Sequence, residues 1–135
     1  MAALVDTNVV VYAFDTAEPE KRNLAVSVLE SGERLVVSTQ VLLETWWVLT
    51  RRLASPLSED AALEVVDELC RLPVVATDAE LVRRAIRTSQ RRGIAVFDAL
   101  IVEAARSSGC DRVLTEDLQA GQDFDGVVIE NPFAG

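Results

Sequence analysis

ALVDTNVVVYAFD, residues 3–15, contains two apolar runs separated by a carboxylate, a hydroxyl and an amide at Asp6, Thr7 and Asn8. The first run, which ends with Leu4 to Asp6, predicts a buried strand, and the run after Asn8 predicts a short helix. In open parallel sheets, ligands bind outside the carboxyl ends of the strands. The position of the three polar side chains therefore indicates a functional edge of a sheet.

Predicted strands and helices alternate along the rest of the chain. We expect strands at residues 34–38, 73–76, 112–115 and 126–130, and helices at 19–32, 38–54, 58–70, 77–93 and 97–109. Local signals support the helix ends: Pro19 suits a first turn, Thr77 and Glu80 form a capping box, and Gly93 is a stop residue. This alternation is typical of a parallel central sheet flanked by helices. We predict a three-layer α/β fold that forms a single domain over residues 1–135.

The composition narrows the classes of function. The chain has no histidine, which excludes histidine-assisted Ser or Cys triads and ordinary Cys/His zinc sites. Cys70 and Cys110 stand alone and are expected to be free core thiols in a reducing compartment. The longest apolar runs have about six residues, against ~18 for a membrane span, and the start of the chain does not resemble a signal peptide. We therefore expect a cytoplasmic protein that does not interact with membranes.

Charge is distributed unevenly along the chain. The formal net charge of −9 repels nucleic acid overall, yet every basic residue except Lys21 is an arginine. The arginines cluster at residues 51–52 and 83–92. Two interpretations of the second cluster remain open. It is either a solvated helix face paired with acids such as Glu80, or a local phosphate-binding edge, since the arginine fork suits phosphate geometry.

Four acidic residues are predicted to lie near the carboxyl edge of the sheet: Asp6, Glu44, Asp98 and Asp117. Asp6 follows the first strand, and Asp117 comes two residues after the strand at 112–115. Glu44 lies in the second turn of the helix that leaves the strand at 34–38, and Asp98 opens its own helix. Taken singly, Asp6 could serve backbone amides, Asp98 could cap its helix and Asp117 could be a turn residue.

Glu44 has no comparable ordinary explanation. Its helical neighbours Val41, Trp47 and Val48 are apolar, and no Lys or Arg stands at i+4, so we expect it to emerge among apolar side chains. Carboxylates that converge in such surroundings need a counter-charge to stay ionised. Without histidine, a hard oxygen-binding ion such as Mg²⁺ or Mn²⁺ is the natural candidate. Metal-assisted phosphoryl chemistry is the reaction class that uses such a site.

These residues resemble the PIN-domain ribonucleases, and most closely the toxins of VapBC toxin–antitoxin pairs, over essentially the whole chain. The similar stretches are LVDTNVVVYAFD (4–15), VSTQVLLETWWVL (37–49), VFDALIVEAARSSGCDRVLTEDLQ (96–119) and FDGVVIENPF (124–133). The resemblance implies a compact Rossmann-like PIN domain that acts as an endoribonuclease, hydrolysing phosphodiester bonds in single-stranded RNA with Mg²⁺ or Mn²⁺. It also implies a homodimer and a cognate antitoxin that blocks the site.

The same resemblance assigns roles to individual residues. Asp6, Glu44, Asp98 and Asp117 match the family's acidic quartet, which is catalytic and binds the metal, while Asn8 and Thr115 match its supporting polar positions. Asp123 lies close to Asp117 in the sequence and is a further candidate metal ligand that replaces or supplements it.

Two further interpretations rest on the residues themselves. Trp46 and Trp47 are interpreted as core and dimer packing rather than RNA stacking platforms, because base-stacking surfaces sit on exposed, basic ground. A non-enzymatic alternative also stands beside the nuclease: an α/β binding module whose acidic pocket binds arginines of a protein partner. A phosphatase of the haloacid dehalogenase type is disfavoured, because Asn8 stands where such an enzyme needs an acid.

Overall fold

A computed structural model describes residues 2–134 as one sheet with helices on both sides. The strands are β1 (Ala2–Val5), β2 (Arg34–Ser38), β3 (Val74–Val75), β4 (Arg112–Leu114), β5 (Asp123–Phe124) and β6 (Val127–Glu130). The helices are α1 (Thr7–Tyr12), α2 (Pro19–Leu29), α3 (Thr39–Arg51), α4 (Glu59–Leu69), α5 (Ala79–Arg92) and α6 (Val96–Ser107). None of these helices is both long and apolar enough to cross a membrane.

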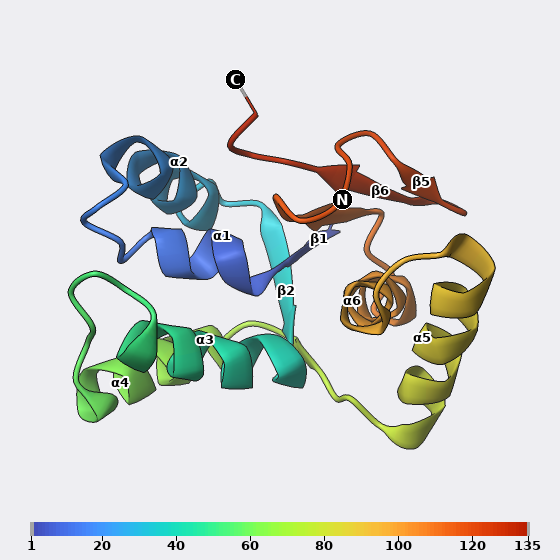
Figure 1. Ribbon diagram of the computed structural model, residues 1–135, viewed down its shortest axis with the longest axis horizontal. Helices are drawn as coiled ribbons and strands as arrows, with labels where there is room; N and C mark the ends of the chain where they lie inside the picture. Colours follow the sequence, from blue (N-terminus) through green and yellow to red (C-terminus); the bar gives the residue numbers. More distant parts are fainter. Residues whose placement is uncertain (1, 135) are drawn as a thin grey trace.

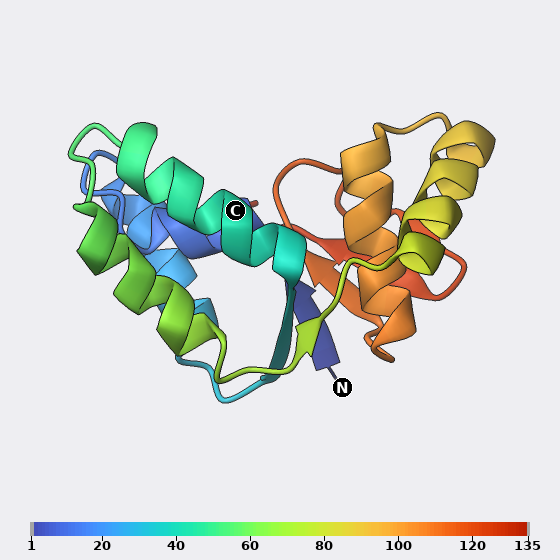
Figure 2. The same cartoon turned by 90° about the horizontal axis from the view of Figure 1, so that it is seen from below.

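The sheet separates two groups of helices. Figures 1 and 2 show α1 to α4 on one side of the sheet and the α5–α6 pair on the other. Apolar side chains of β1, β2, β4 and β6 fill the space between the layers, and Leu4, Val37, Val113 and Ile129 are almost completely buried. Such strands, buried on both faces, are expected in a parallel sheet covered by helices. The predicted three-layer α/β architecture is confirmed.

The sheet is parallel except at one edge. Its strand order is β3-β2-β1-β4-β6-β5, and β5 runs antiparallel to β6. The two strands are joined by Asp125 and Gly126, whose φ angles of 53° and 101° both lie in the left-handed region. An Asp-Gly pair with positive φ at both positions is the usual two-residue hairpin turn. The sequence analysis predicted β6 but missed this hairpin.

Local capping explains where most helices begin. Ser38 accepts a hydrogen bond from the Val41 amide and so caps α3, and Ser58 does the same for α4. The cap of α5 differs from the prediction, because Asp78 rather than Thr77 accepts the amide hydrogen bond of Leu81. The Thr77 hydroxyl instead lies 2.8 Å from that of Thr39, which joins the start of α5 to the start of α3.

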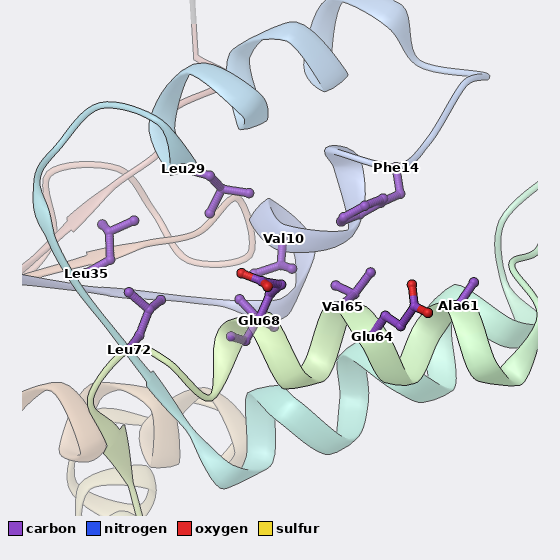
Figure 3. A pocket seen from close by; sticks show the side chains of 10 residues that line it. Val10, Phe14, Leu29, Leu35, Ala61, Glu64, Val65, Glu68 and Leu72 are labelled. Carbon is purple, nitrogen blue, oxygen red and sulfur yellow. The ribbon is translucent and has the colours of Figure 1, made fainter.

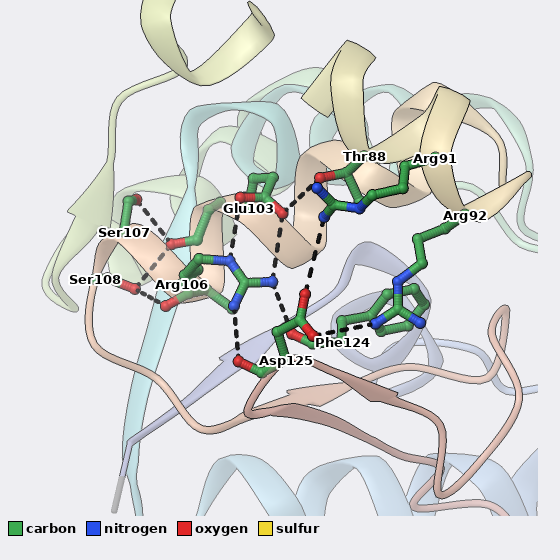
Figure 4. Close-up of polar contacts among 11 residues, drawn as sticks. Thr88, Arg91, Arg92, Glu103, Arg106, Ser107, Ser108, Phe124 and Asp125 are labelled. Carbon is green, nitrogen blue, oxygen red and sulfur yellow. Dashed lines mark hydrogen bonds and ion pairs between the residues drawn. The ribbon is translucent and has the colours of Figure 1, made fainter. Parts of the chain in front are cut away.

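A buried ion pair attaches α6 to the hairpin (Figure 4). Glu103 is only 4% exposed, accepts a hydrogen bond from the Thr88 hydroxyl of α5, and pairs with Arg106 at 3.2 Å. The Arg106 guanidinium also donates to the carbonyls of Phe124 and Asp125, at 2.7 and 3.1 Å. One arginine therefore connects α5, α6 and the β5–β6 hairpin.

Candidate functional site

The site begins with the pairing of β1 and β4. These strands are parallel neighbours with Val5 opposite Leu114, so Asp6 and Thr115 lie side by side just beyond the strand ends. From β1 the chain builds β2 and β3 on one side, while β4, β6 and β5 lie on the other. The gap between β1 and β4 is thus the switch point of the sheet, where open α/β folds bind ligands.

The Thr115 hydroxyl is the centre of a hydrogen-bond network at this edge. It donates to Asp6 Oδ2 at 2.9 Å and accepts from Asn8 Nδ2 at 3.0 Å and from the Asp117 amide at 3.1 Å. A hydroxyl has one donor and two acceptor positions, so all three are used within the protein. Asn8 completes the network by accepting from the Glu116 amide. The side chain of Thr115 therefore orients other groups of the site and has no position left for water.

Asp6 is the buried member of the site. It is 8% exposed, and its Oδ1 accepts the amide of Thr7 at 2.7 Å, which caps α1. Burial raises the pKa of Asp6 to about 6, although the hydrogen bonds from Thr7 and Thr115 oppose the shift. The negative charges of Asp117 and Glu44 contribute to this increase in the pKa. The two polar residues that the sequence analysis placed beside Asp6, Asn8 and Thr115, are indeed found there.

The other acids of the predicted quartet come close enough to influence one another. Partial burial raises the pKa of Glu44, and the charges of Asp117 and Asp98 add to this increase. The pKa of Asp98 is raised by burial and by Asp117. Four elements thus converge: the end of β1, the second turn of α3, the first turn of α6 and the segment after β4. Their negative charges disfavour ionisation of one another.

The acids of this group have no ion-pair partner in the part of the chain that the structure describes. Among the ion pairs formed within residues 2–134, none includes Asp6, Glu44, Asp98 or Asp117. Nor do three or more acidic or thiol side chains in that range already form a cage for a cation. Asp117 and Glu44 are exposed and Asp98 is half-buried, whereas Asp6 is buried. The donor set, uncompensated carboxylate oxygens only, fits a hard divalent cation.

Glu44 differs from its prediction in one respect. The sequence suggested a carboxylate surrounded by apolar side chains, whereas the residue is exposed and its apolar neighbours cover it only in part. The reason is that Leu43 and Trp47, which flank it on the helix surface, are themselves exposed at 72% and 43%.

Asp123 lies apart from the acids. It belongs to β5, is exposed, and its Oδ1 accepts the amide of Gly126 at 2.7 Å within the hairpin turn. It is not among the charges that shift the pKa of Asp6, Glu44 or Asp98, whereas Asp117 shifts all three. Of the two candidates for the last acid, the fold thus brings only Asp117 to the group.

Lys21 and Glu116 form a part of the site that sequence reasoning missed. Glu116 accepts hydrogen bonds from Tyr12 at 2.7 Å and from Lys21 at 3.1 Å, while Lys21 also lies over the ring of Tyr12. The bonds to Tyr12 and Glu116 raise the pKa of Lys21. This cluster fixes the residue between Thr115 and Asp117. The available signal was that Lys21 is the single lysine of the chain, but its partner lies 95 residues away.

The arginine cluster of α5 is divided in its environment. Arg91 and Arg92 approach Asp125 at 3.9 Å (Figure 4). Arg92 also donates to the carbonyl of Asp123. Arg83 and Arg87 are exposed and take part in no ion pair within residues 2–134. The last turn of the cluster is thus attached to the hairpin, while both interpretations from the sequence, a solvated face and a phosphate-binding edge, stay predictions.

A hollow lies away from the acids, between α1, α2, α4 and β2 (Figure 3). It has a volume of about 500 Å³. The side chains that line it are mainly apolar, including Val10, Phe14, Leu35 and Val65, and Glu64 and Glu68 of α4 add carboxylates.

A doubly wound sheet with an acidic group at its switch point defines a class of α/β proteins, and comparison identifies the family. The PIN domain family model matches residues 3–122, and the chain belongs to this family. No curated protein sequence matches the chain.

Several solved structures share the fold. A toxin–antitoxin complex from Klebsiella pneumoniae aligns over 97% of this chain and 98% of its own, with a TM-score of 0.73 and 18% identity. VapC20 of Mycobacterium tuberculosis, described as a sarcin–ricin loop cleaving toxin, aligns over 82% of this chain and 86% of its own, with a TM-score of 0.68 and 21% identity. VapBC2 from Rickettsia felis, bound to a promoter DNA fragment, aligns over 97% of this chain and 98% of its own, with a TM-score of 0.66 and 19% identity.

Proposed function

We propose that the chain is a metal-dependent endoribonuclease that hydrolyses phosphodiester bonds in single-stranded RNA, and that it is the toxin of a VapBC-type pair. The observation that carries this proposal is the group of four acids that form no ion pair within residues 2–134, at the switch point of a PIN fold. The fold neighbours described as toxins support the toxin assignment. An RNA substrate is consistent with action in the cytoplasm.

Asp6, Glu44, Asp98 and Asp117 are the proposed ligands of Mg²⁺ or Mn²⁺, and Asp6 is the fixed member. A divalent cation at such a site lowers the pKa of a bound water and neutralises charge on the phosphate. Asp6 is held by the Thr7 amide and the Thr115 hydroxyl, so its oxygens keep their orientation before any ligand binds. Asn8 and Thr115 act by positioning Asp6 and Asp117.

The four acids also provide a position for a basic residue of a protein partner. An arginine of a protein partner, placed among the four carboxylates, would occupy the same position as the metal and block catalysis. We propose a cognate antitoxin as that partner, and the hollow of Figure 3 as the place where its apolar residues bind. Glu64 and Glu68 favour a partner helix that carries basic residues beside its apolar ones.

We also propose that the chain forms a homodimer through the face shared by α5 and α6. Phe97, at 69% exposed, and Ile86, at 43%, lie on this face. With Val82, Ala85, Val96 and Leu100 they line an apolar hollow of about 310 Å³. Exposed apolar patches of this kind mark interaction sites more often than free surface.

The decisive experiment is cleavage of end-labelled single-stranded RNA by the purified chain with Mn²⁺ or Mg²⁺, repeated with EDTA. We expect cutting that requires the metal and stops with EDTA. Asp6→Asn should reduce the rate by more than about 100-fold, because it removes the fixed ligand, and should leave the circular dichroism spectrum unchanged. Asp67→Asn, an exposed acid on α4, is the matched control and should cleave like the original chain.

The same assay separates the nuclease from the binding module. A chain that binds no Mn²⁺, cuts no RNA in a mixed pool, and yet binds an arginine-rich peptide through its acids would identify the non-catalytic alternative. Full cleavage by the Asp6→Asn variant would remove Asp6 from the site.

A further inference from the structure

Trp47 is exposed, in contrast to its neighbour. Trp46 donates its indole N–H to the carbonyl of Glu59 and packs against the cluster around Leu49. Trp47 remains 43% exposed and contributes to neither core cluster. Of the expected core and dimer packing, core packing therefore holds for Trp46 and not for Trp47.

The protein surface around Trp47 is basic. The guanidinium of Arg52 lies 4.7 Å from the centre of its ring, and that of Arg51 lies 5.8 Å away. Both arginines are exposed, and neither takes part in an ion pair within residues 2–134. On a chain with a net charge of −9, two cations without acidic partners stacked on an exposed indole form an unusual surface. An exposed aromatic ring on basic ground is the feature that single-stranded nucleic acid binds.

This surface is continuous with the acidic site. Trp47 and Arg51 follow Glu44 at i+3 and i+7 on α3, so the three side chains share one face of the helix. By the helical rise they lie about 4.5 and 10.5 Å further along the axis than Glu44. Figure 2 shows α3 starting at the carboxyl end of β2 and leading away from the sheet. A strand that reaches Glu44 at the acids can therefore continue over Trp47 to the arginines.

We propose that Trp47, Arg51 and Arg52 form an RNA-binding track outside the acidic site. A base of single-stranded RNA that flanks the scissile bond stacks on the Trp47–arginine group, and Arg51 and Arg52 contact the adjoining phosphates. This inference rests on the proposed nuclease function and adds to it the place where the substrate strand leaves the site. It predicts a preference for strands long enough to span from the acids to the track.

Trp47 fluorescence tests the track directly. The chain has two tryptophans, so Trp46→Phe leaves Trp47 as the single emitter and Trp47→Phe leaves Trp46. The probe is a single-stranded oligoadenylate RNA added in EDTA, where no cleavage occurs, with duplex RNA of the same length for comparison. We expect the single strand to quench Trp47 and the duplex to have little effect. Trp46, which is half-buried although its ring centre lies 5.3 Å from the Arg51 guanidinium, should respond less than Trp47.

Binding affinities supply the second measurement. Trp47→Leu keeps an apolar side chain but removes the ring, and should raise the Kd for the single strand about tenfold. Arg51→Gln should weaken binding and reduce the slope of log K against log salt by about 1. Arg22→Gln, an exposed arginine of α2 without an ion-pair partner in residues 2–134, is the control and should bind like the original chain. Circular dichroism verifies that each variant is folded.

The outcomes are distinguishable from failure of the proposed function. If the chain cleaves RNA but Trp47 is not quenched and Trp47→Leu binds normally, the track is wrong while the nuclease stands. If Trp47 emission responds to protein concentration and not to RNA, the face belongs to contacts between copies of the chain, and the track is again wrong. If the chain neither binds nor cuts RNA under any metal condition, the proposed function itself fails.

Discussion

Thr115 shows how much of this site depends on one hydroxyl. Its Oγ1 is bonded to Asp6, Asn8 and the Asp117 amide, and the residue is 1% exposed. A buried polar group that loses its hydrogen-bond partner costs roughly 1–3 kcal/mol of stability. Loss of the Thr115 hydroxyl would remove the partner of three such groups at once. Thr115, which bears no charge, therefore positions the buried Asp6 and the backbone of the exposed Asp117.

Replacing Thr115 by Val should disorganise the acids. The isosteric change removes the donor to Asp6 and the acceptor for two N–H groups, and we expect the free energy of unfolding to fall by about 2 kcal/mol or more. RNA cleavage should fall at least about tenfold, since Asp117 loses its backbone anchor. Thr115→Ser, which keeps the hydroxyl, should retain most of the activity in the same assay. Equal activity of the Val and Ser variants would exclude the positioning role.

Asp6 makes stability depend on pH in the metal-free chain. Its pKa is raised from 3.8 in the unfolded chain to about 6 in the folded one. The folded state thus binds the Asp6 proton more tightly than the unfolded chain does, so protonation of Asp6 stabilises the fold. This stabilisation is complete below about pH 4 and is lost as the pH rises through about 6. The loss amounts to about 3 kcal/mol, at 1.36 kcal/mol for each pKa unit. Other carboxylates superimpose their own dependence.

Thermal unfolding in EDTA, with Asp6→Asn as reference, isolates this contribution. The difference in Tm between the two proteins should change between pH 4 and pH 7 in favour of the variant. Mn²⁺ should raise the Tm of the original chain more at pH 7.5 than at pH 5, because protons compete with the metal for the same oxygens. A Tm difference that stays constant over this pH range would contradict the shifted pKa.

Helix α6 supplies Asp98 at its first turn and is anchored near its last. Arg106 bonds to Glu103 on the same helix and to two carbonyls of the β5–β6 hairpin. The pair shows why an element cannot be judged by its own sequence: Glu103 and Arg106 read as an i,i+3 surface pair, whereas Glu103 is buried.

Removing this anchor should be costly. Arg106→Met leaves the buried Glu103 without its cation and two carbonyls without a donor, and we expect a loss of about 3 kcal/mol in the free energy of unfolding. Arg71→Met is the matched control, because Arg71 and Glu68 form an exposed i,i+3 pair worth less than about 1 kcal/mol. Urea denaturation of both variants measures the contrast. Similar midpoints would show that the Glu103 pair contributes no more than a surface pair.

The assembly of two copies concerns the α5–α6 face. We expect sedimentation to give a dimer and Phe97→Ser to shift it toward monomer, since Phe97 is the most exposed apolar side chain of that face. Leu24→Ser, which changes an exposed leucine of α2, should leave the dimer intact. A monomeric original chain would rule out this contact.

The sequence alone was sufficient to predict the alternation of strands and helices, the three layers and most helix ends. These features depend on apolar periodicity and on capping residues such as Ser38 and Ser58, which act over three or four positions. The Asp125–Gly126 turn was a local signal of the same kind that went unused, and with it the hairpin was missed. The placement of Asp6 and Asp117 at the carboxyl edge of the sheet also followed from the expected parallel strands, whereas Asn8 and Thr115 were assigned by resemblance to the PIN-domain family.

Other features required the folded chain, because they depend on groups that meet only after folding. Lys21 donates a hydrogen bond to Glu116, which lies 95 residues later in the sequence, and Arg106 donates to the carbonyls of the hairpin. Asp123 accepts a hydrogen bond within the β5–β6 turn, whereas Asp117 lies near Asp6. Trp46 and Trp47 are neighbours of one type, yet a turn of about 100° per residue directs one to the core and the other to solvent. The apolar periodicity of the sequence predicts which residues share a face of α3, but only the packing of α4 against α3 determines which face is covered.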